Sequence, residues 1–510
     1  MTRNLVFHGG PIRTLDPATP LACELAIRDG RVASTPAHDA ERIDLGGCCI
    51  VPGLADAHVH FPSWSLAQRQ VRLEGAHSLE DALGRVAEAL PHVPRGGWLR
   101  GVGWRDSDWP EPPTSAALDR VAPATPVALF SRDYHSLWLN GTALARADGP
   151  LESSGGVVER DERGQPTGVL RENAAWLFRD RHVRPTVDEM VAATREGLRL
   201  AAARGVTAVH DKDGWLGAFE VFARLHERGE LTLRIWQSFP WDRVDELRAL
   251  GIRSGFGDDM LRIGYLKGFM DGTLGSATAR LLDGSGVEIT SREQLEEVVR
   301  RAAEAHFPVA VHAIGDAANR AALDAFEAAR DAWQPAGLRP RIEHAQLLAA
   351  EDVARFAQIG VAASVQFSHA PSDRDLADRL WEGRAGAYAY RSLLDAGAHL
   401  ANGSDAPVEE LDPLAGIVAG VRRTLDERPP WRPEQAVTVE DALRAATVGP
   451  AWLEGEEHRR GTLVPGMLAD LVVLDRDPFT CRSEELPTLR VLATMVDGRW
   501  THLALQGLSA

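Results

Sequence analysis

Two histidines placed two residues apart, His58 and His60, are the first candidates for chemistry along the chain. They close an apolar segment, 49–60, that has the composition of a buried strand. Because successive side chains of a strand alternate between its faces, both imidazoles point to one face, with their backbones about 6–7 Å apart. Such a pair suits two ligands of one metal ion. Taken alone, it is also what two ordinary polar residues at a strand end would look like.

Later apolar segments end in side chains that could complete a metal site. Imidazole and carboxylate groups suit Zn²⁺ or a similar divalent ion. Each residue has a plainer alternative, because a histidine can be a satisfied core residue and a lysine can be solvated or ion-paired. Together, six such residues at the ends of five segments predict one shared metal site. They are His58, His60, Lys267, His312, His344 and Asp405.

The segments that carry these residues alternate with stretches of helical period. This order is typical of parallel strands joined by crossover helices. Eight apolar segments are found, the number that a closed (β/α)₈ barrel of the TIM type requires, and active sites of such barrels form at the carboxyl ends of the strands. We expect strands at 49–60, 205–211, 233–239, 261–271, 308–316, 340–347, 360–369 and 398–405, and helices at 187–204, 217–228, 291–306, 318–330, 350–358 and 413–425.

Both ends of the chain read as short strands with Asp-Gly turns, at Asp29-Gly30 and Asp497-Gly498. We therefore expect residues 1–50 and 458–510 to form one composite β-sandwich domain, with the barrel at 51–457. The stretch of sequence between the first and second strands is far longer than an ordinary βα connection. An inserted subdomain at about 62–190 is expected to cover the catalytic face.

Composition excludes several classes of protein. The chain has 510 residues, of which 44% are hydrophobic and 25% charged, as in ordinary globular proteins. Its net charge of −17 argues against nucleic acid or an anionic membrane as a partner. Four cysteines without paired spacing fit a reducing cytoplasm, and neither a signal peptide nor a membrane span is expected. A small-molecule substrate is the expected partner, and the question of a homo-oligomer stays open.

The strings around the six residues resemble the amidohydrolase superfamily, and in detail its YtcJ-like branch of metal-dependent hydrolases. VPGLADAHVHF is similar to the first-strand motif, and GTLVPGMLADLVVLD to the C-terminal strand, so the resemblance covers nearly the whole chain. The segment HDKDG at 210–214 is not diagnostic of the branch. The strings in between are KGFMDGTLGSATA, VAVHAIGDAANRAALDAF, PRIEHAQLL and NGSDAPVEELDPLAGI.

The resemblance implies one metal on His58, His60 and Asp405 and, in dinuclear members, a second on Lys267, His312 and His344. A lysine serves as a ligand in the family after CO₂ adds to its neutral amine, and burial favours that amine. The resemblance equally allows a mononuclear arrangement, in which one ion lies on His58, His60, His312 and Asp405 and His344 acts on the substrate.

Three further residues are weaker candidates for substrate binding. His135 matches a segment where the branch carries a histidine, but a structural role is the alternative. Gln366 and His369 end the expected seventh strand, where lining a pocket and packing are both open.

The resulting interpretation is a hydrolase that uses metal-activated water. Asp405 is expected to move the proton, with His344 as the second catalytic residue, and the bond is expected to be a non-peptide C–N bond of an amide, N-acyl or N-formyl compound. One alternative is a mononuclear aminohydrolase that deaminates a heterocycle. Another is a catalytically silent scaffold, although such relatives lose metal ligands and all six are present here.

Overall fold

The computed structural model describes residues 4–105 and 109–504. Residues 1–3 and 505–510 of the expected terminal domain, and residues 106–108 of the expected insertion, lie outside the described residues.

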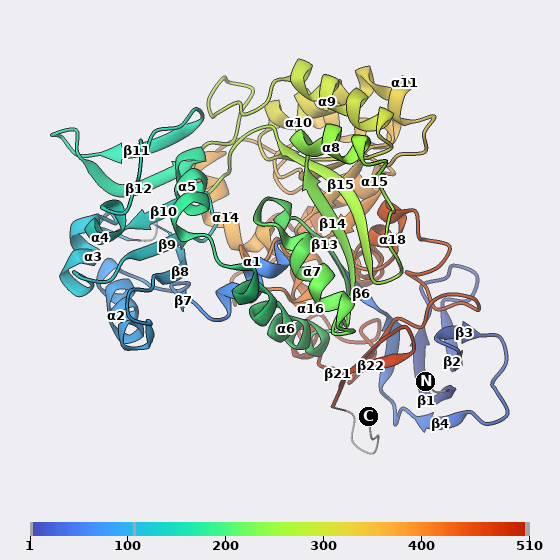
Figure 1. Cartoon of the computed structure of the whole chain (residues 1–510). Helices are drawn as coiled ribbons and strands as arrows, with labels where there is room; N and C mark the ends of the chain where they lie inside the picture. Colours follow the sequence, from blue (N-terminus) through green and yellow to red (C-terminus); the bar gives the residue numbers. More distant parts are fainter. Residues whose placement is uncertain (1–3, 106–108, 505–510) are drawn as a thin grey trace.

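Eight parallel strands form a central sheet whose order follows the chain from first to last. A parallel bridge between Val59 and Ala406 returns the chain after the last strand to the first, so the sheet is a nearly closed barrel (Figure 1). The predicted (β/α)₈ class is confirmed. The strands are β6 (Leu54–Val59), β13 (Val206–Asp211), β14 (Arg234–Pro240), β15 (Leu261–Phe269), β16 (Val309–Ala313), β17 (Arg341–His344), β18 (Ala362–Val365) and β19 (Leu400–Asn402).

Some helices around the barrel begin at residues whose side chains satisfy free backbone N–H groups. Thr186 with Glu189, and Ser291 with Gln294, form capping boxes at the starts of two long helices. Within the described residues, no helix is long and apolar enough to cross a membrane. The main barrel helices are α1 (Phe61–Ala67), α6 (Val187–Ala203), α7 (Ala218–Glu227), α8 (Val244–Ala249), α9 (Arg292–Glu304), α10 (Asp316–Ala328), α12 (Ala350–Val353), α13 (Arg355–Ile359), α14 (His369–Leu380), α15 (Tyr390–Asp395), α16 (Pro413–Arg422), α17 (Val439–Ala445) and α18 (Val448–Glu454).

The expected first strand, 49–60, is two strands in the structure. β5 (Cys49–Pro52) belongs to another sheet, and only β6 belongs to the barrel. Gly53 joins them, and a Cβ at this position would lie 2.4 Å from Oγ1 of Thr207. The chain can therefore change sheets here only because the residue has no side chain.

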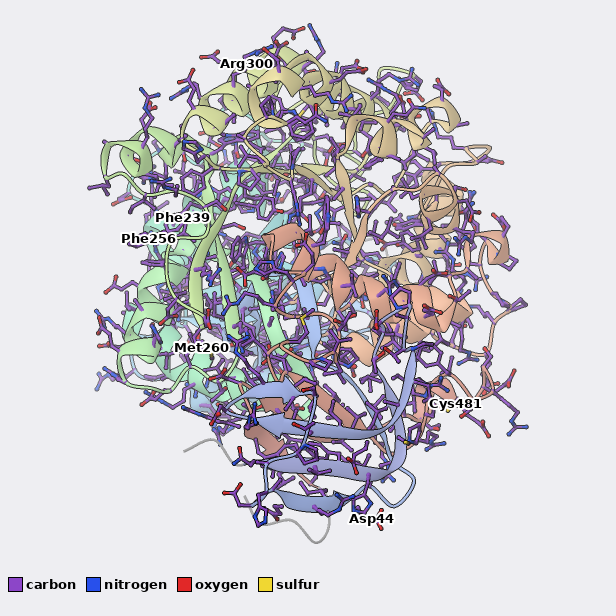
Figure 2. The ribbon with its side chains drawn as sticks, turned by 90° about the vertical axis from the view of Figure 1, so that its right-hand side faces the viewer. Asp44, Phe239, Phe256, Met260, Arg300 and Cys481 are labelled. Atoms are coloured by element: carbon purple, nitrogen blue, oxygen red, sulfur yellow. The ribbon has the colours of Figure 1, made fainter. Side chains whose placement is uncertain are left out.

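The two ends of the chain share one sheet. β20 pairs antiparallel with β5, with Val473 opposite Ile50. Figure 2 shows Asp44 and Cys481, from opposite ends of the sequence, at the same end of the molecule. The strands are β1 (Leu5–Arg13), β2 (Leu21–Arg28), β3 (Arg31–Ala33), β4 (Glu41–Asp44), β5, β20 (Leu471–Leu474), β21 (Val491–Val496) and β22 (Arg499–Leu503).

Between β6 and β13 the chain builds a six-stranded sheet beside the barrel (Figure 1). Trp104, Trp109 and Trp138 pack ring against ring in its core, with centroids 5.9–6.4 Å apart. Its elements are β7 (Val71–Arg72), α2 (Leu79–Ala89), β8 (Leu99–Trp104), α3 (Ser115–Val121), β9 (Val127–Ser131), β10 (Ser136–Leu139), α4 (Gly141–Leu144), β11 (Gly156–Arg160), β12 (Pro166–Glu172) and α5 (Asn173–Phe178).

Candidate metal centre

The first strand and the segment after the last strand bring three potential ligands together. Nε2 of His58 lies 3.2 Å from Oδ1 of Asp405, and Nε2 of His60 lies 3.7 Å from the same oxygen. One ligand atom from each of the three residues lies within 4.8 Å of the others. The backbone N–H of Asp405 donates to the His58 carbonyl oxygen at 2.7 Å, which fixes the carboxylate over the first strand.

Carboxylates hold the other ring nitrogens of both histidines. Nδ1 of His58 lies 2.8 Å from Oε2 of Glu343, and Nδ1 of His60 lies 2.9 Å from Oδ1 of Asp213. An ionised carboxylate only accepts hydrogen bonds, so each Nδ1 carries the proton and each Nε2 keeps its lone pair toward Asp405. Carboxylate–histidine pairs of this kind orient metal ligands in proteins. The donor set therefore fits a divalent metal ion.

Glu343 owes its charge to buried cations. Burial opposes ionisation, but Arg341 and Lys212 outweigh it and hold the pKa of Glu343 well below its ordinary value. Oε1 of Glu343 lies 2.9 Å from Nε of Arg341 and 3.0 Å from Nζ of Lys212. All three side chains are fully buried. The carboxylate behind His58 is therefore locked in place from its far side.

The other three predicted ligands lie beside the first three. The ring centroid of His344 is 4.8 Å from that of His58 and 4.6 Å from that of His312. Nε2 of His312 lies 2.9 Å from the carbonyl oxygen of Gly272 and donates to it, which leaves Nδ1 for the site. All six predicted ligands line one cavity.

Lys267 is buried and has few polar partners. Its Nζ donates to the Gly268 carbonyl oxygen at 3.0 Å and lies 3.9 Å from the Phe269 ring centroid. Burial lowers the pKa of Lys267 to about 7. A large fraction of the amine is therefore neutral near pH 7. The neutral amine is the form that reacts with CO₂.

The weaker candidates occupy three different places. Nε2 of His369 lies 3.9 Å from Oδ2 of Asp405, and His369, His344 and Asp405 form a second close group of potential ligand atoms. Oε1 of Gln366 accepts from Nδ1 of His344 at 2.7 Å, so this residue supports a candidate ligand rather than lining the cavity. His135 reaches the cavity from the insertion.

Sequence reasoning missed Glu343 and Asp213. The alternation of a strand puts Glu343 and His344 on opposite faces. His344 has a φ of +75°, however, and it lines the same cavity as His58, the histidine that Glu343 holds. Asp213 lies in the undiagnostic HDKDG segment. There Asp211 accepts from the backbone N–H groups of Phe61 and Asp213, both at 2.8 Å, and so joins that segment to the start of α1.

The cavity above the candidate ligands has a volume of about 640 Å³. Three elements contribute an aromatic wall to it. The Phe269 ring at the end of β15 lies 5.8 Å from that of Trp176 on α5 of the insertion and 5.5 Å from that of Trp215, which follows β13. A cavity of this size suits a small organic molecule. The further lining residues include Arg105, Arg132, Asp133, Tyr134, Trp241, Asp373 and Glu409.

The chain is similar to known proteins over nearly its whole length. Residues 41–502 match the model of the amidohydrolase family. The putative amidohydrolase YtcJ of Bacillus subtilis is 30% identical over 97% of this chain and 98% of its own, and the N-substituted formamide deformylase of Arthrobacter pascens is 30% identical over the same shares.

A solved structure gives the same result. An uncharacterized metal-dependent hydrolase from Pyrococcus furiosus superposes with a TM-score of 0.74 at 27% identity, covering 94% of this chain and 100% of its own. The resemblance found in the sequence is thereby confirmed. The chain belongs to the amidohydrolase family, in its YtcJ-like branch of metal-dependent hydrolases.

Proposed function

We propose that this metal-dependent hydrolase cleaves a non-peptide C–N bond, in an amide, N-acyl or N-formyl compound of low molecular weight. The observation that carries the proposal is the convergence of His58, His60 and Asp405, with both histidines held by carboxylates. The similarity to an N-substituted formamide deformylase supports the bond type.

The six predicted ligands form two groups of donors for divalent metal ions, and zinc is the metal that we propose. His58, His60 and Asp405 form the first group, and Lys267, His312 and His344 form the second after carboxylation of Lys267. In that reaction the neutral Nζ adds to CO₂ and loses a proton, which gives a carbamate. A divalent ion supplies Lewis-acid activation of water and of the substrate carbonyl.

Asp405 is placed to move the proton of the reaction. Its carboxylate oxygens lie 3.2 Å from Nε2 of His58 and 3.9 Å from Nε2 of His369 and adjoin the cavity, and an ionised carboxylate in this position can accept a proton. The oxygen of water adds to the carbonyl carbon, and Asp405 takes one proton of that water. When the C–N bond breaks, Asp405 delivers this proton to the leaving nitrogen. The products are a carboxylic acid and an amine.

His344 is the second proposed catalytic residue. Gln366 fixes its Nδ1–H, so Nε2 faces the cavity next to His58 and His312. In the dinuclear arrangement it is a ligand. In the mononuclear arrangement it contacts the substrate.

Product analysis tests the proposal. The protein, supplied with Zn²⁺, is incubated with a panel of N-formyl and N-acetyl anilines and alkylamines, and acid and amine are quantified. We expect equal amounts of acid and amine from at least one member. Ammonia released from aminated heterocycles instead, without amide cleavage, would establish the deaminase alternative. No turnover of either panel by metal-loaded protein would favour the silent scaffold.

A further inference from the structure

The insertion contributes one histidine to the cavity among its described residues, His135. It follows β9 in the turn to β10 and is only 7% exposed. Its ring centroid lies 6.1 Å from that of His312 and 5.0 Å from that of Trp176. The ring is therefore close enough to the candidate metal centre for one small substrate to contact both.

Glu172 orients this ring. Its Oε2 lies 2.6 Å from Nδ1 of His135, and its backbone N–H donates to the His135 carbonyl oxygen at 2.7 Å. Glu172 has a φ of +53°, a conformation that costs a non-glycine residue about 1–3 kcal/mol. Strain of this kind persists where the surrounding structure fixes a functional geometry.

The barrel fixes the pair from its own side. Oγ1 of Thr278 donates to Oε1 of Glu172 at 3.1 Å. Oγ1 of Thr273 and Oγ of Ser276 donate to Oδ2 of Asp133 at 3.0 and 3.1 Å. Oδ1 of Asp133 in turn accepts from the backbone N–H of His135 at 3.1 Å. The position of His135 is therefore set relative to the barrel as well as to the insertion.

His135 forms an ion pair with Glu172. The 2.6 Å between Nδ1 of His135 and Oε2 of Glu172 is the short distance of a charge-assisted hydrogen bond, in which the imidazole is protonated. An imidazolium carries a proton on both nitrogens. Nδ1–H serves Glu172, while Nε2–H has no hydrogen-bond partner among the described residues and adjoins the cavity.

We propose that His135 is a catalytic residue, whose Nε2–H donates to the substrate carbonyl oxygen as that oxygen gains negative charge, with Glu172 as its positioning residue. This inference rests on the proposed function. No covalent bond to His135 forms or breaks, and the hydrogen bond strengthens as the oxyanion develops. A preorganised donor of this kind typically contributes about 10²–10³-fold to kcat.

Matched variants test the role. His135→Gln and Glu172→Gln are compared with His182→Gln, which replaces another histidine of the insertion that also lies beside a carboxylate, 3.4 Å from Asp148, and does not line the cavity. Three quantities are measured: kcat and KM for N-phenylformamide, Kd for phenylphosphinate, and metal content. Phenylphosphinate is a tetrahedral anion that resembles the intermediate of formamide hydrolysis.

For His135→Gln we expect kcat to fall about 10²–10³-fold with KM changed less than about threefold, phenylphosphinate to bind at least about tenfold more weakly, and metal content to stay parental. Glu172→Gln is expected to lose about 10–10²-fold in kcat, and it decides the question by the same criteria if His135→Gln does not fold. His182→Gln is expected to match the parent.

Parental kcat and phosphinate affinity in the His135 and Glu172 variants would overturn this inference but not the proposed function. Loss of metal from these variants would do the same. A parent that neither hydrolyses the formamide nor binds the phosphinate would overturn the proposed function and this inference together.

Discussion

At the scale of the single residue, we expect Asp405 to matter more for the chemical reaction than for folding. It has a φ of +59°, a conformation that asparagine tolerates as well as aspartate does. Asp405→Asn keeps size and backbone preference but removes the charge and the basic oxygen. We therefore expect a folded protein with kcat reduced about 10²–10⁴-fold and partial loss of metal. Steady-state kinetics with metal analysis measure this, and Asp39→Asn, an exposed aspartate of the terminal sheet region, is the control. Near-parental turnover at full metal occupancy would move the proton path to His344.

The carboxylates behind the histidines give a second prediction. Asp213→Asn removes the charge that holds Nδ1 of His60, and such changes typically weaken metal binding about 10–100-fold. Zn²⁺ affinity is measured by competition with a chelator. Glu343→Gln should act in the same direction, with added loss of stability because Arg341 and Lys212 lose their buried counter-charge. The exposed Glu351→Gln is the control. Unchanged affinity in Asp213→Asn would show that His60 does not need this partner.

The predictability of the site follows from the kind of contact involved. His58, His60 and Asp405 lie at or just after the ends of strands of one parallel barrel. Topology alone therefore brings them to one face, and the sequence pattern suffices to predict that. Glu343 acts through a contact between β17 and β6, and Asp213 through a contact between the turn after β13 and the residue that follows β6. His344, the neighbour of Glu343, has a positive φ. Neither a strand-to-strand contact nor a local dihedral angle is visible in hydrophobic periodicity.

At the scale of elements, a buried ion pair joins the barrel to the terminal sheet. Nε and Nη2 of Arg234 on β14 lie 2.7 and 2.9 Å from the two oxygens of Asp470, which directly precedes β20. Both side chains are buried. The contact therefore joins the terminal sheet to this part of the barrel.

Removing one partner of this pair should be costly. Asp470→Asn removes the main counter-charge of the buried Arg234 guanidinium and leaves only Asp497, at 3.8 Å, as a weaker partner. Loss of one partner of a buried pair costs up to about 3–5 kcal/mol. The midpoint of urea unfolding should therefore fall clearly, while Glu24→Gln, which breaks an exposed pair with Arg42, should leave it nearly unchanged. Equal midpoints in both variants would contradict this assignment.

The same pair predicts a direction of pH dependence. Burial opposes ionisation of Asp470, but Arg234 outweighs it, so the pKa of Asp470 is lower in the folded protein than in the unfolded chain. The stabilisation is therefore fully present above the unfolded pKa of about 3.9 and is lost as the pH falls through the folded value. The difference in unfolding midpoint between parent and Asp470→Asn should shrink on acidification, and a difference that grows would contradict the sign.

Element boundaries were predictable to the extent that they follow hydrophobic period. All eight barrel strands lie where their apolar segments predict them. The segment 49–60 contains a strand of the terminal sheet as well as β6, and hydrophobic period does not reveal that its two halves pair in different sheets, although Pro52-Gly53 stands at their junction. The expected helix at 350–358 is likewise two short helices, α12 and α13. The break at Ala354 was not predictable, because no Gly or Pro marks it in the sequence.

At the scale of the whole molecule, the two ends of the chain depend on each other. β5 is fully buried and takes its antiparallel partner from β20, while Phe7, Ile27 and Leu471 share one core. The boundaries at 50 and 458 remain a proposal. Removing residues 458–510 should expose the edge of β5 and this core, and exposed apolar edges of that kind aggregate.

We accordingly expect the truncated chain, 1–457, to be insoluble or to elute as aggregate in size-exclusion chromatography. Removal of residues 505–510 alone is the control and should leave a soluble protein. A soluble 1–457 chain with parental stability would show that the N-terminal strands do not need the C-terminal ones.

Metal stoichiometry tests the central claim most directly. Elemental analysis compares the parent, prepared without chelator and supplied with Zn²⁺ or Mn²⁺, with a His58→Asn/His60→Asn double variant whose folding is checked by circular dichroism. The account predicts about one or two equivalents of divalent metal per parent chain and a marked loss in the double variant. A parent that holds less than about half an equivalent even after metal is added, or a folded double variant that keeps the parental content, would contradict it.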